Sequence, residues 1–235
     1  MQDNNIFIAL DFPDAESVNS FLKPFNLLEK KPALKVGMEL FYSEGPYFVK
    51  QLRDAGYNIF LDLKLYDIPN TVAKSVSSIN KLDVQYLTLH ASGGKRMLEA
   101  AVQNKSKQLK LLAVTQLTSF SEQEMQKTQL TQVSMNDSVK HLAKIAYQVG
   151  VNGTISSANE AAMIKMATEE SFLRITPGIR LLGDDVSDQR RVMTPRKARE
   201  NDSSGLVVGR SITQAVDPLQ AYQRVLREWQ EGDVQ

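Results

Sequence analysis

Short apolar runs rich in β-branched residues recur along the 235-residue chain, with amphipathic stretches of helical spacing between them. Eight such runs can be counted, and the first five begin at positions 6, 33, 58, 84 and 109, so that successive runs start 25 to 27 residues apart. That interval is the length of one strand, one helix and two short loops. The pattern predicts strands over residues 6–11, 33–38, 58–65, 84–91, 109–117, 153–157, 173–179 and 205–210.

Eight β-α units in a chain of this length predict an α/β fold in which one parallel sheet closes into a single (β/α)8 barrel. The helical spacing of Val139, Ala143 and Ala146 is typical of the intervening segments. The alternative is an open doubly wound sheet, but such sheets usually have fewer strands, and the sequence lacks a Gly-rich dinucleotide loop. No low-complexity tract or Ser/Pro-rich linker divides the chain, so we expect residues 1–235 to form one domain.

The composition argues against several classes of partner and site. The 28 basic and 27 acidic residues leave a formal net charge of +1, which is too little to attract nucleic acid by charge alone. The absence of cysteine excludes disulfides and thiolate metal sites, and with only two histidines we expect no metal, although magnesium held by carboxylates stays open. No apolar run approaches the roughly 18 residues of a membrane helix, and no export signal is visible, so we expect a cytoplasmic protein without a membrane partner.

The inner faces of the predicted strands carry titratable groups near their C-terminal ends. Because alternate side chains of a strand point to opposite faces, Asp11, Lys35, Asp62, Lys64 and His90 all fall on the row that faces the barrel interior. Lysine and aspartate are costly there unless they are paired or functional. Barrel enzymes keep their active sites at the C-terminal ends of the strands, so this row indicates an active site.

The segment DLKLYDIPNT, residues 62–71, is the strongest local signal. Asp62 and Lys64 share the inner face, and Asp67 lies just past the strand, where Pro69 is expected to open the next helix. Together with Lys35 they supply two ammonium groups and two carboxylates. A buried ion-pair network that only sets the barrel register is the structural alternative, since such networks also perturb pKa values.

This segment and several others resemble the bacterial orotidine 5'-phosphate decarboxylases, the enzymes of the last step of UMP synthesis. The resemblance is carried by ALDF, LKVGMELF, DLKLYDIPNT, LHASGG, VTQLTS, TPGIR and VVGRSIT, which extend from residue 9 to residue 213. The charged core alone is shared with sister barrels that act on sugar phosphates, whereas the flanking motifs are typical of the decarboxylase. Three positions depart from the family pattern: Tyr66 replaces an expected His, and Leu181 and Ser211 each stand where Pro is common.

The resemblance implies a decarboxylase without a cofactor that works as a homodimer with shared active sites. It implies that Lys64 is the proton donor to C6 of the pyrimidine, in a charge network with Lys35, Asp62 and Asp67, the last of these coming from the second subunit. The other implied contacts are Asp11, Lys35 and the partner-derived Thr71 with the ribose, Asp62 with the departing carboxylate, Thr118 and Ser119 with the pyrimidine, and Arg180, Gln189, Gly209 and Arg210 with the phosphate.

The residues alone allow more than one interpretation of two segments and two alternative functions. Without the resemblance, the segment VVGRS fits two interpretations equally well: a phosphate site, or a strand that ends in a turn glycine and a solvated Arg. Residues 180–192 are polar enough to form a lid over the phosphate. A sister sugar-phosphate lyase or synthase would use the same charged core with a divalent metal. A phosphate-ligand binding module would keep the charged mouth without turnover.

Overall fold

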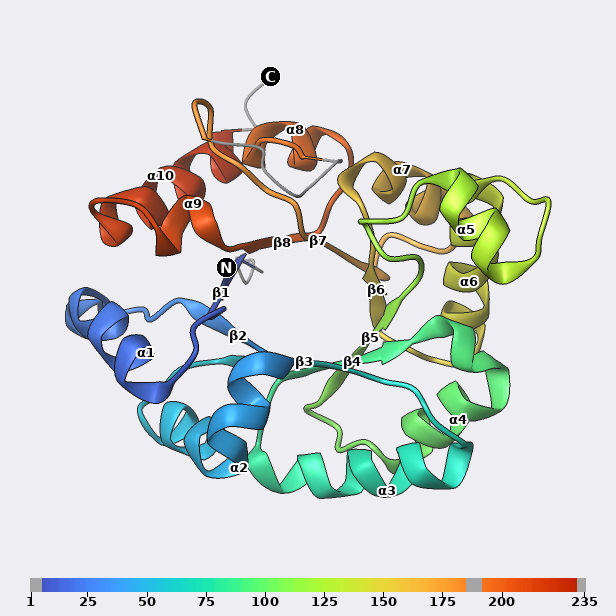
Figure 1. Ribbon diagram of the computed structural model, residues 1–235, viewed down its shortest axis with the longest axis horizontal. Helices are drawn as coiled ribbons and strands as arrows, with labels where there is room; N and C mark the ends of the chain where they lie inside the picture. Colours follow the sequence, from blue (N-terminus) through green and yellow to red (C-terminus); the bar gives the residue numbers. More distant parts are fainter. Residues whose placement is uncertain (1–5, 185–191, 232–235) are drawn as a thin grey trace.

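Eight parallel strands pair in chain order in the computed structural model, and pairing of the last strand with the first closes them into a barrel (Figure 1). The structure describes residues 6–184 and 192–231. The strands are β1 Ile6–Ala9, β2 Ala33–Gly37, β3 Ile59–Leu65, β4 Tyr86–His90, β5 Lys110–Val114, β6 Gly153–Ile155, β7 Leu173–Thr176 and β8 Gly205–Val208. Each predicted strand is present. β3 ends at the predicted residue, and the other seven end earlier than expected, since the last apolar residues of several runs already belong to the loops of the mouth. The predicted barrel is confirmed, and the open sheet is wrong.

The helices form a ring outside the strands (Figure 1). They are α1 Ala15–Leu22, α2 Met38–Asp54, α3 Pro69–Ile79, α4 Gly94–Asn104, α5 Glu122–Gln129, α6 Met135–Gln148, α7 Ala158–Ala167, α8 Pro195–Glu200, α9 Arg210–Thr213 and α10 Pro218–Gln230, with 3₁₀ turns at Lys23–Leu27, Asn80–Leu82 and Ala91–Gly93. Pro69 does open α3, as expected for a residue whose missing N–H is not needed in the first turn. Over the described ranges, no helix combines the length and apolar composition required to cross a bilayer.

Apolar side chains fill the lower part of the barrel and form the floor of its mouth. The inner-facing members of this cluster are Phe7, Ala9, Phe60, Tyr86, Leu112, Ile175 and Val207. The ring of Phe7 contacts those of Phe60 and Tyr86 edge to face, with centroids 5.2 and 5.0 Å apart. The alternate residues of the same strands, such as Ile8 and Leu61, pack outward in the core shared with the helices. The division into an inner and an outer row that alternation predicts for the first strands is therefore confirmed.

One irregularity interrupts the barrel wall at its C-terminal end. Leu61 pairs with Leu87 and Leu65 pairs with Leu89, so the three residues 62–64 of β3 stand opposite the single Thr88 of β4. Such a bulge bends the strand and redirects its side chains. It falls on the segment that carries Asp62 and Lys64.

Candidate active site

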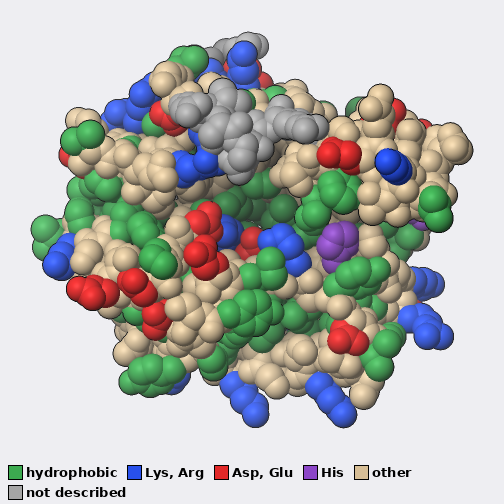
Figure 2. All heavy atoms as spheres, in the orientation of Figure 1, with side chains coloured by type: hydrophobic (Ala, Val, Ile, Leu, Met, Phe, Trp, Pro, Cys, Tyr) green, Lys and Arg blue, Asp and Glu red, His purple; other side chains and the backbone are tan. Residues whose placement is uncertain are grey.

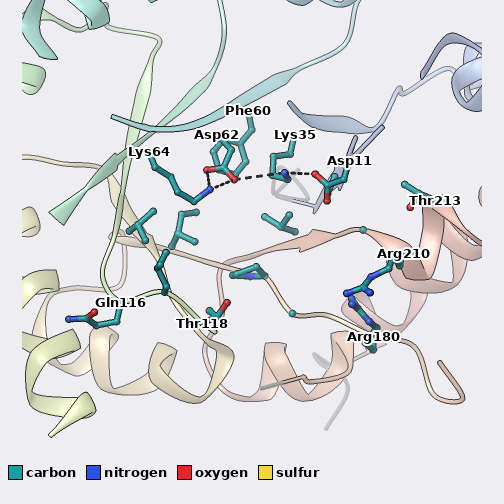
Figure 3. A pocket seen from close by; sticks show the side chains of 18 of the residues that line it. Asp11, Lys35, Phe60, Asp62, Lys64, Gln116, Thr118, Arg180, Arg210 and Thr213 are labelled. Atoms are coloured by element: carbon teal, nitrogen blue, oxygen red, sulfur yellow. Dashed lines mark hydrogen bonds and ion pairs between the residues drawn. The ribbon is translucent and has the colours of Figure 1, made fainter. Parts of the chain in front are cut away.

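Four charged side chains form an alternating row across the C-terminal mouth of the barrel (Figure 3). Lys35 Nζ lies 3.0 Å from Asp11 Oδ1 and 3.8 Å from Asp62 Oδ2. Lys64 Nζ lies 3.0 Å from both carboxylate oxygens of Asp62. Strands β2 and β3 and the loop after β1 therefore bring two ammonium groups and two carboxylates into one continuous network.

The backbone of Lys64 adopts an unusual conformation. Its φ angle is 50°, in the left-handed region that residues with a side chain rarely occupy. Strain of this kind persists only where the surrounding structure enforces it, and it is concentrated at functional sites. Together with the bulge in β3, the conformation holds the Lys64 side chain in the mouth beside Asp62.

The charged row forms one wall of a cavity of about 450 Å³. Figure 2 shows acidic and basic side chains alternating across this hollow, with apolar surface around them. The lining residues come from seven strands or the loops that follow them, and they are Ala9, Asp11, Lys35, Phe60, Asp62, Lys64, Val114, Gln116, Leu117, Thr118, Ile155, Pro177, Gly178, Arg180, Val207, Gly209, Arg210, Thr213 and Gln214. A cavity of this size, with an apolar floor and a few convergent polar groups, is typical of a small-molecule site.

Two arginines stand at the other end of the cavity from the pair of Lys64 and Asp62 (Figure 3). Arg180 follows β7 and is 7 % exposed, and its guanidinium donates to the carbonyl oxygen of Ile179 at 2.9 Å. Arg210 begins α9, directly after Gly209 at the end of β8. Gly178 beside them has a φ of +79°, which a residue with a side chain would adopt only under strain. The site thus combines a row of alternating charges with a cationic end suited to an anion.

Not every expected site residue lies in this cavity. Asp67, Thr71 and Ser119 are exposed and are not among the lining residues of this chain. The Asp67 carboxylate instead accepts a hydrogen bond from the backbone N–H of Ile68 at 2.6 Å. Gln189 lies outside the described residues, as does much of the expected lid over 180–192.

His90 is the last residue of β4, the strand next to the one that carries Asp62 and Lys64. The ring of Tyr66 stacks on the His90 imidazole, with ring centroids 5.4 Å apart. Burial of the imidazole, and to a smaller degree the positive charge of Lys64, lower the pKa of His90 below its ordinary value of 6.5. The shift favours the neutral form of the imidazole beside the charged row.

Comparison with known proteins decides between the relatives that share this charged core. The family model described as "Orotidine 5'-phosphate decarboxylase / HUMPS family" matches residues 4–225. The chain belongs to this family. Orotidine 5'-phosphate decarboxylase of Oenococcus oeni is 58% identical over 225 residues, covering 96% of this chain and 98% of the relative. The enzyme of the same name from Ligilactobacillus salivarius is 50% identical, over 98% and 100% of the two chains.

The fold is also similar to solved structures, one of which is a member of the same family. The crystal structure of orotidine 5'-phosphate decarboxylase from Lactobacillus acidophilus has a TM-score of 0.85 and 38% identity, and the match covers 97% of this chain and 99% of that one. An uncharacterized conserved protein from Geobacillus kaustophilus has a TM-score of 0.84 and 40% identity over 95% and 99%. The resemblance read from the motifs and the expected class of enzyme, a carboxy-lyase, are confirmed.

The three departures from the orotidine 5'-phosphate decarboxylase pattern have separate structural settings. Tyr66 is 63% exposed and stacks on His90, whereas Leu181 is buried against the core. The Ser211 hydroxyl donates weakly to the carbonyl oxygen of Ile179 at 3.5 Å. None of the three lines the cavity.

Sequence reasoning gave no role to several residues that line the cavity or contact its charged row. Gln116 and Pro177 line the cavity and could have been found, since they belong to the VTQLTS and TPGIR motifs. Thr88 lies two positions before His90 on β4, and its hydroxyl contacts both Asp62 and Lys64. Among the residues that the structure describes, no three His, Asp or Glu side chains form a group that could hold a metal ion, and the expected metal-free, cofactor-free site stays a prediction.

Proposed function

We propose that the protein converts orotidine 5'-phosphate to UMP and CO2 and that Lys64 donates the proton to C6. The observation that carries this proposal is the position of the Lys64 ammonium, 3.0 Å from both oxygens of Asp62, at one wall of a cavity whose other end holds Arg180 and Arg210. A nucleoside monophosphate has a phosphate at one end and a base at the other. The two charged ends of the cavity match that arrangement.

The residue types suit the chemistry of the step. The bond between C6 and the carboxylate carbon breaks, CO2 leaves, and the electron pair stays on C6 in an orbital that the ring cannot delocalise well. A fixed ammonium group beside C6 stabilises this developing charge and then transfers its proton to the carbon. The neutral amine of Lys64 regains a proton from solvent. Asp62, which holds the ammonium from both oxygens, orients the donor before the substrate arrives.

Asp62 also affects the carboxylate that leaves. Two unit charges 4 Å apart interact by about 4 kcal/mol at an effective dielectric constant of 20. A substrate carboxylate held beside Asp62 is repelled by about that amount, and the repulsion ends as neutral CO2 departs. Asp62 is 14 % exposed at its side chain, so solvent screens this interaction only in part.

The rest of the cavity offers groups for the ribose and the phosphate. Asp11 and Lys35, 3.0 Å apart at the edge of the charged row, provide an acceptor and a donor for ribose hydroxyls. Arg180 and Arg210 provide the charge and the paired N–H groups that bind phosphate. Thr118 lines the cavity on the side where a pyrimidine would lie, and Gly209 leaves room for the close approach of an oxygen.

We further propose that two copies of the chain share their active sites, with Asp67 and Thr71 serving the site of the partner. Both residues are exposed, and neither is among the residues that line the charged cavity of its own chain. The neighbours of Asp67 support an interface there, since Tyr66 is 63% exposed and Ile68 is 66% exposed. Large apolar side chains exposed together at the edge of a site are typical of a surface that binds another protein.

One assay separates this function from its two rivals. The purified protein is incubated with orotidine 5'-phosphate in the presence of EDTA, and the loss of the orotate absorbance is followed. Turnover without a divalent metal supports the decarboxylase and contradicts both the metal-dependent sugar-phosphate enzyme and the binding module. Binding of the nucleotide without any turnover contradicts the proposal and supports the module.

We also propose that residues 1–235 act as one domain in the cytoplasm. The barrel that uses strands from residue 6 to residue 208 supports a single folding unit. Limited proteolysis and cell fractionation test these two statements.

A further inference from the structure

The hydroxyl group of Thr88 lies between the two residues that carry the proposed chemistry. Its Oγ1 atom is 2.9 Å from Asp62 Oδ1 and 2.8 Å from the backbone nitrogen of Lys64. Thr88 is fully buried on β4 and does not line the cavity. It therefore contacts the catalytic pair from behind, on the side away from the substrate.

The direction of both hydrogen bonds is determined by the partners. An ionised carboxylate can only accept, and a backbone N–H can only donate. The single hydroxyl proton of Thr88 is therefore donated to Asp62, while its oxygen accepts the N–H of Lys64. An apolar side chain such as that of valine cannot make either bond.

The bulge in β3 explains why a side chain is needed at this point. Residues 62–64 stand opposite Thr88 alone, so the regular ladder between β3 and β4 is interrupted there. The N–H of Lys64, whose φ is 50°, is satisfied by the Thr88 hydroxyl instead of a carbonyl of β4. Without this acceptor the group would be left unsatisfied in the barrel wall, which costs free energy and favours another backbone conformation.

We infer that Thr88 is a positioning residue for the decarboxylation, which acts by holding Lys64 in its left-handed conformation and one oxygen of Asp62 in register with the Lys64 ammonium. This inference rests on the proposed function of Lys64 and Asp62. It assigns to Thr88 no contact with the substrate. Its loss would therefore reduce the rate of the chemical step more than the affinity for the nucleotide.

Thr88→Val tests this inference, because valine keeps the branched shape and removes the hydroxyl. We expect kcat to fall about 10- to 100-fold, the effect of losing a hydrogen bond to a charged group, while the inhibition constant of UMP changes by less than about threefold. Thr88→Ser keeps both hydrogen bonds and is expected to retain kcat within about threefold. If Thr88→Val does not fold, Thr88→Ala carries the same expectation.

Thr154→Val is the matched control. Thr154 is also a fully buried threonine on a barrel strand, but its hydroxyl has no hydrogen-bond partner among the described residues. We expect this variant to keep kcat. Equal kcat values in Thr88→Val, Thr154→Val and the unmodified protein would overturn the inference, and so would a loss confined to UMP binding. A failure of the unmodified protein to turn over orotidine 5'-phosphate would instead contradict the proposed function.

Discussion

Lys64 Nζ lies 3.0 Å from each of the two carboxylate oxygens of Asp62, a residue only two positions earlier on the same strand. Positions i and i+2 of a strand share a face, and the left-handed backbone of Lys64 places its long side chain back over Asp62. The side chains of Asp62 and Lys64 are 14% and 29% exposed. Because removing one partner of such a pair leaves the other charge poorly compensated, we expect neither residue to be replaceable without loss.

Arg210→Ala is expected to weaken the binding of UMP by about 1.5–3 kcal/mol, the cost of a lost hydrogen bond between charged groups. This corresponds to a dissociation constant about 10 to 150 times larger. Uridine, which has no phosphate, is expected to bind both proteins equally. Isothermal titration calorimetry with the two ligands measures the difference.

Arg196→Ala is the control for this experiment. Arg196 is an exposed arginine of α8 that pairs with Glu231 at 2.6 Å, outside the cavity. Its removal is expected to leave UMP binding unchanged. If Arg210→Ala binds UMP as tightly as the Arg196→Ala variant, the phosphate is held elsewhere.

The lowered pKa of His90 predicts a pH dependence of stability. Between this pKa and about 6.5, the value for the unfolded chain, the unfolded state binds more protons than the folded state. The free energy of unfolding therefore rises with pH through this window and falls as the pH drops. We expect the urea midpoint to decrease less in His90→Gln than in the unmodified protein on going from about pH 7.5 to about pH 5.5.

His141→Gln is the matched variant, since His141 is exposed on α6. It is expected to show the same decrease as the unmodified protein. An identical decrease in all three proteins would mean that His90 does not contribute to this dependence.

Alternation along the strands was enough to predict most of the charged row. Asp62 and Lys64 differ by two positions, and Lys35 occupies the inner row of β2 by the same rule. The bulge could not be foreseen, because apolar periodicity does not report where a strand gains residues. It did not disturb the prediction, because two extra residues leave the inner and outer rows unchanged, whereas one extra residue would exchange them.

The loops were less predictable than the strands. Alternation stops where a strand stops, so the residues themselves placed Asp67 only just past the strand. Its role in a partner's site, and the roles of Thr71 and Ser119, rested on the family resemblance, and none of the three lines the cavity of its own chain. The contact of Thr88 with Lys64 depends on the bulge and on a left-handed backbone, neither of which has a signal in the residue types.

Subunit mixing tests the shared active site. Lys64→Ala and Asp67→Ala are each expected to be inactive, and the two are denatured and refolded together. Random pairing makes about half of the dimers mixed, and one of the two sites in each mixed dimer is intact, so about a quarter of the original activity should return. If Asp67 served its own chain, every site would keep one lesion. No recovery, with mixed dimers confirmed by mass spectrometry, would refute the shared site.

The most direct test of the role of the charged row is the rate of CO2 release from orotidine 5'-phosphate by Lys64→Ala. Lys50→Ala, which removes an exposed lysine that pairs with Asp54 on α2, is the control. We predict that Lys64→Ala loses about 10⁴-fold or more in turnover, since one residue supplies both the proton and the nearest positive charge, while UMP still binds and Lys50→Ala stays fully active. Turnover by Lys64→Ala within about tenfold of that of Lys50→Ala would contradict the assignment of Lys64 as the proton donor.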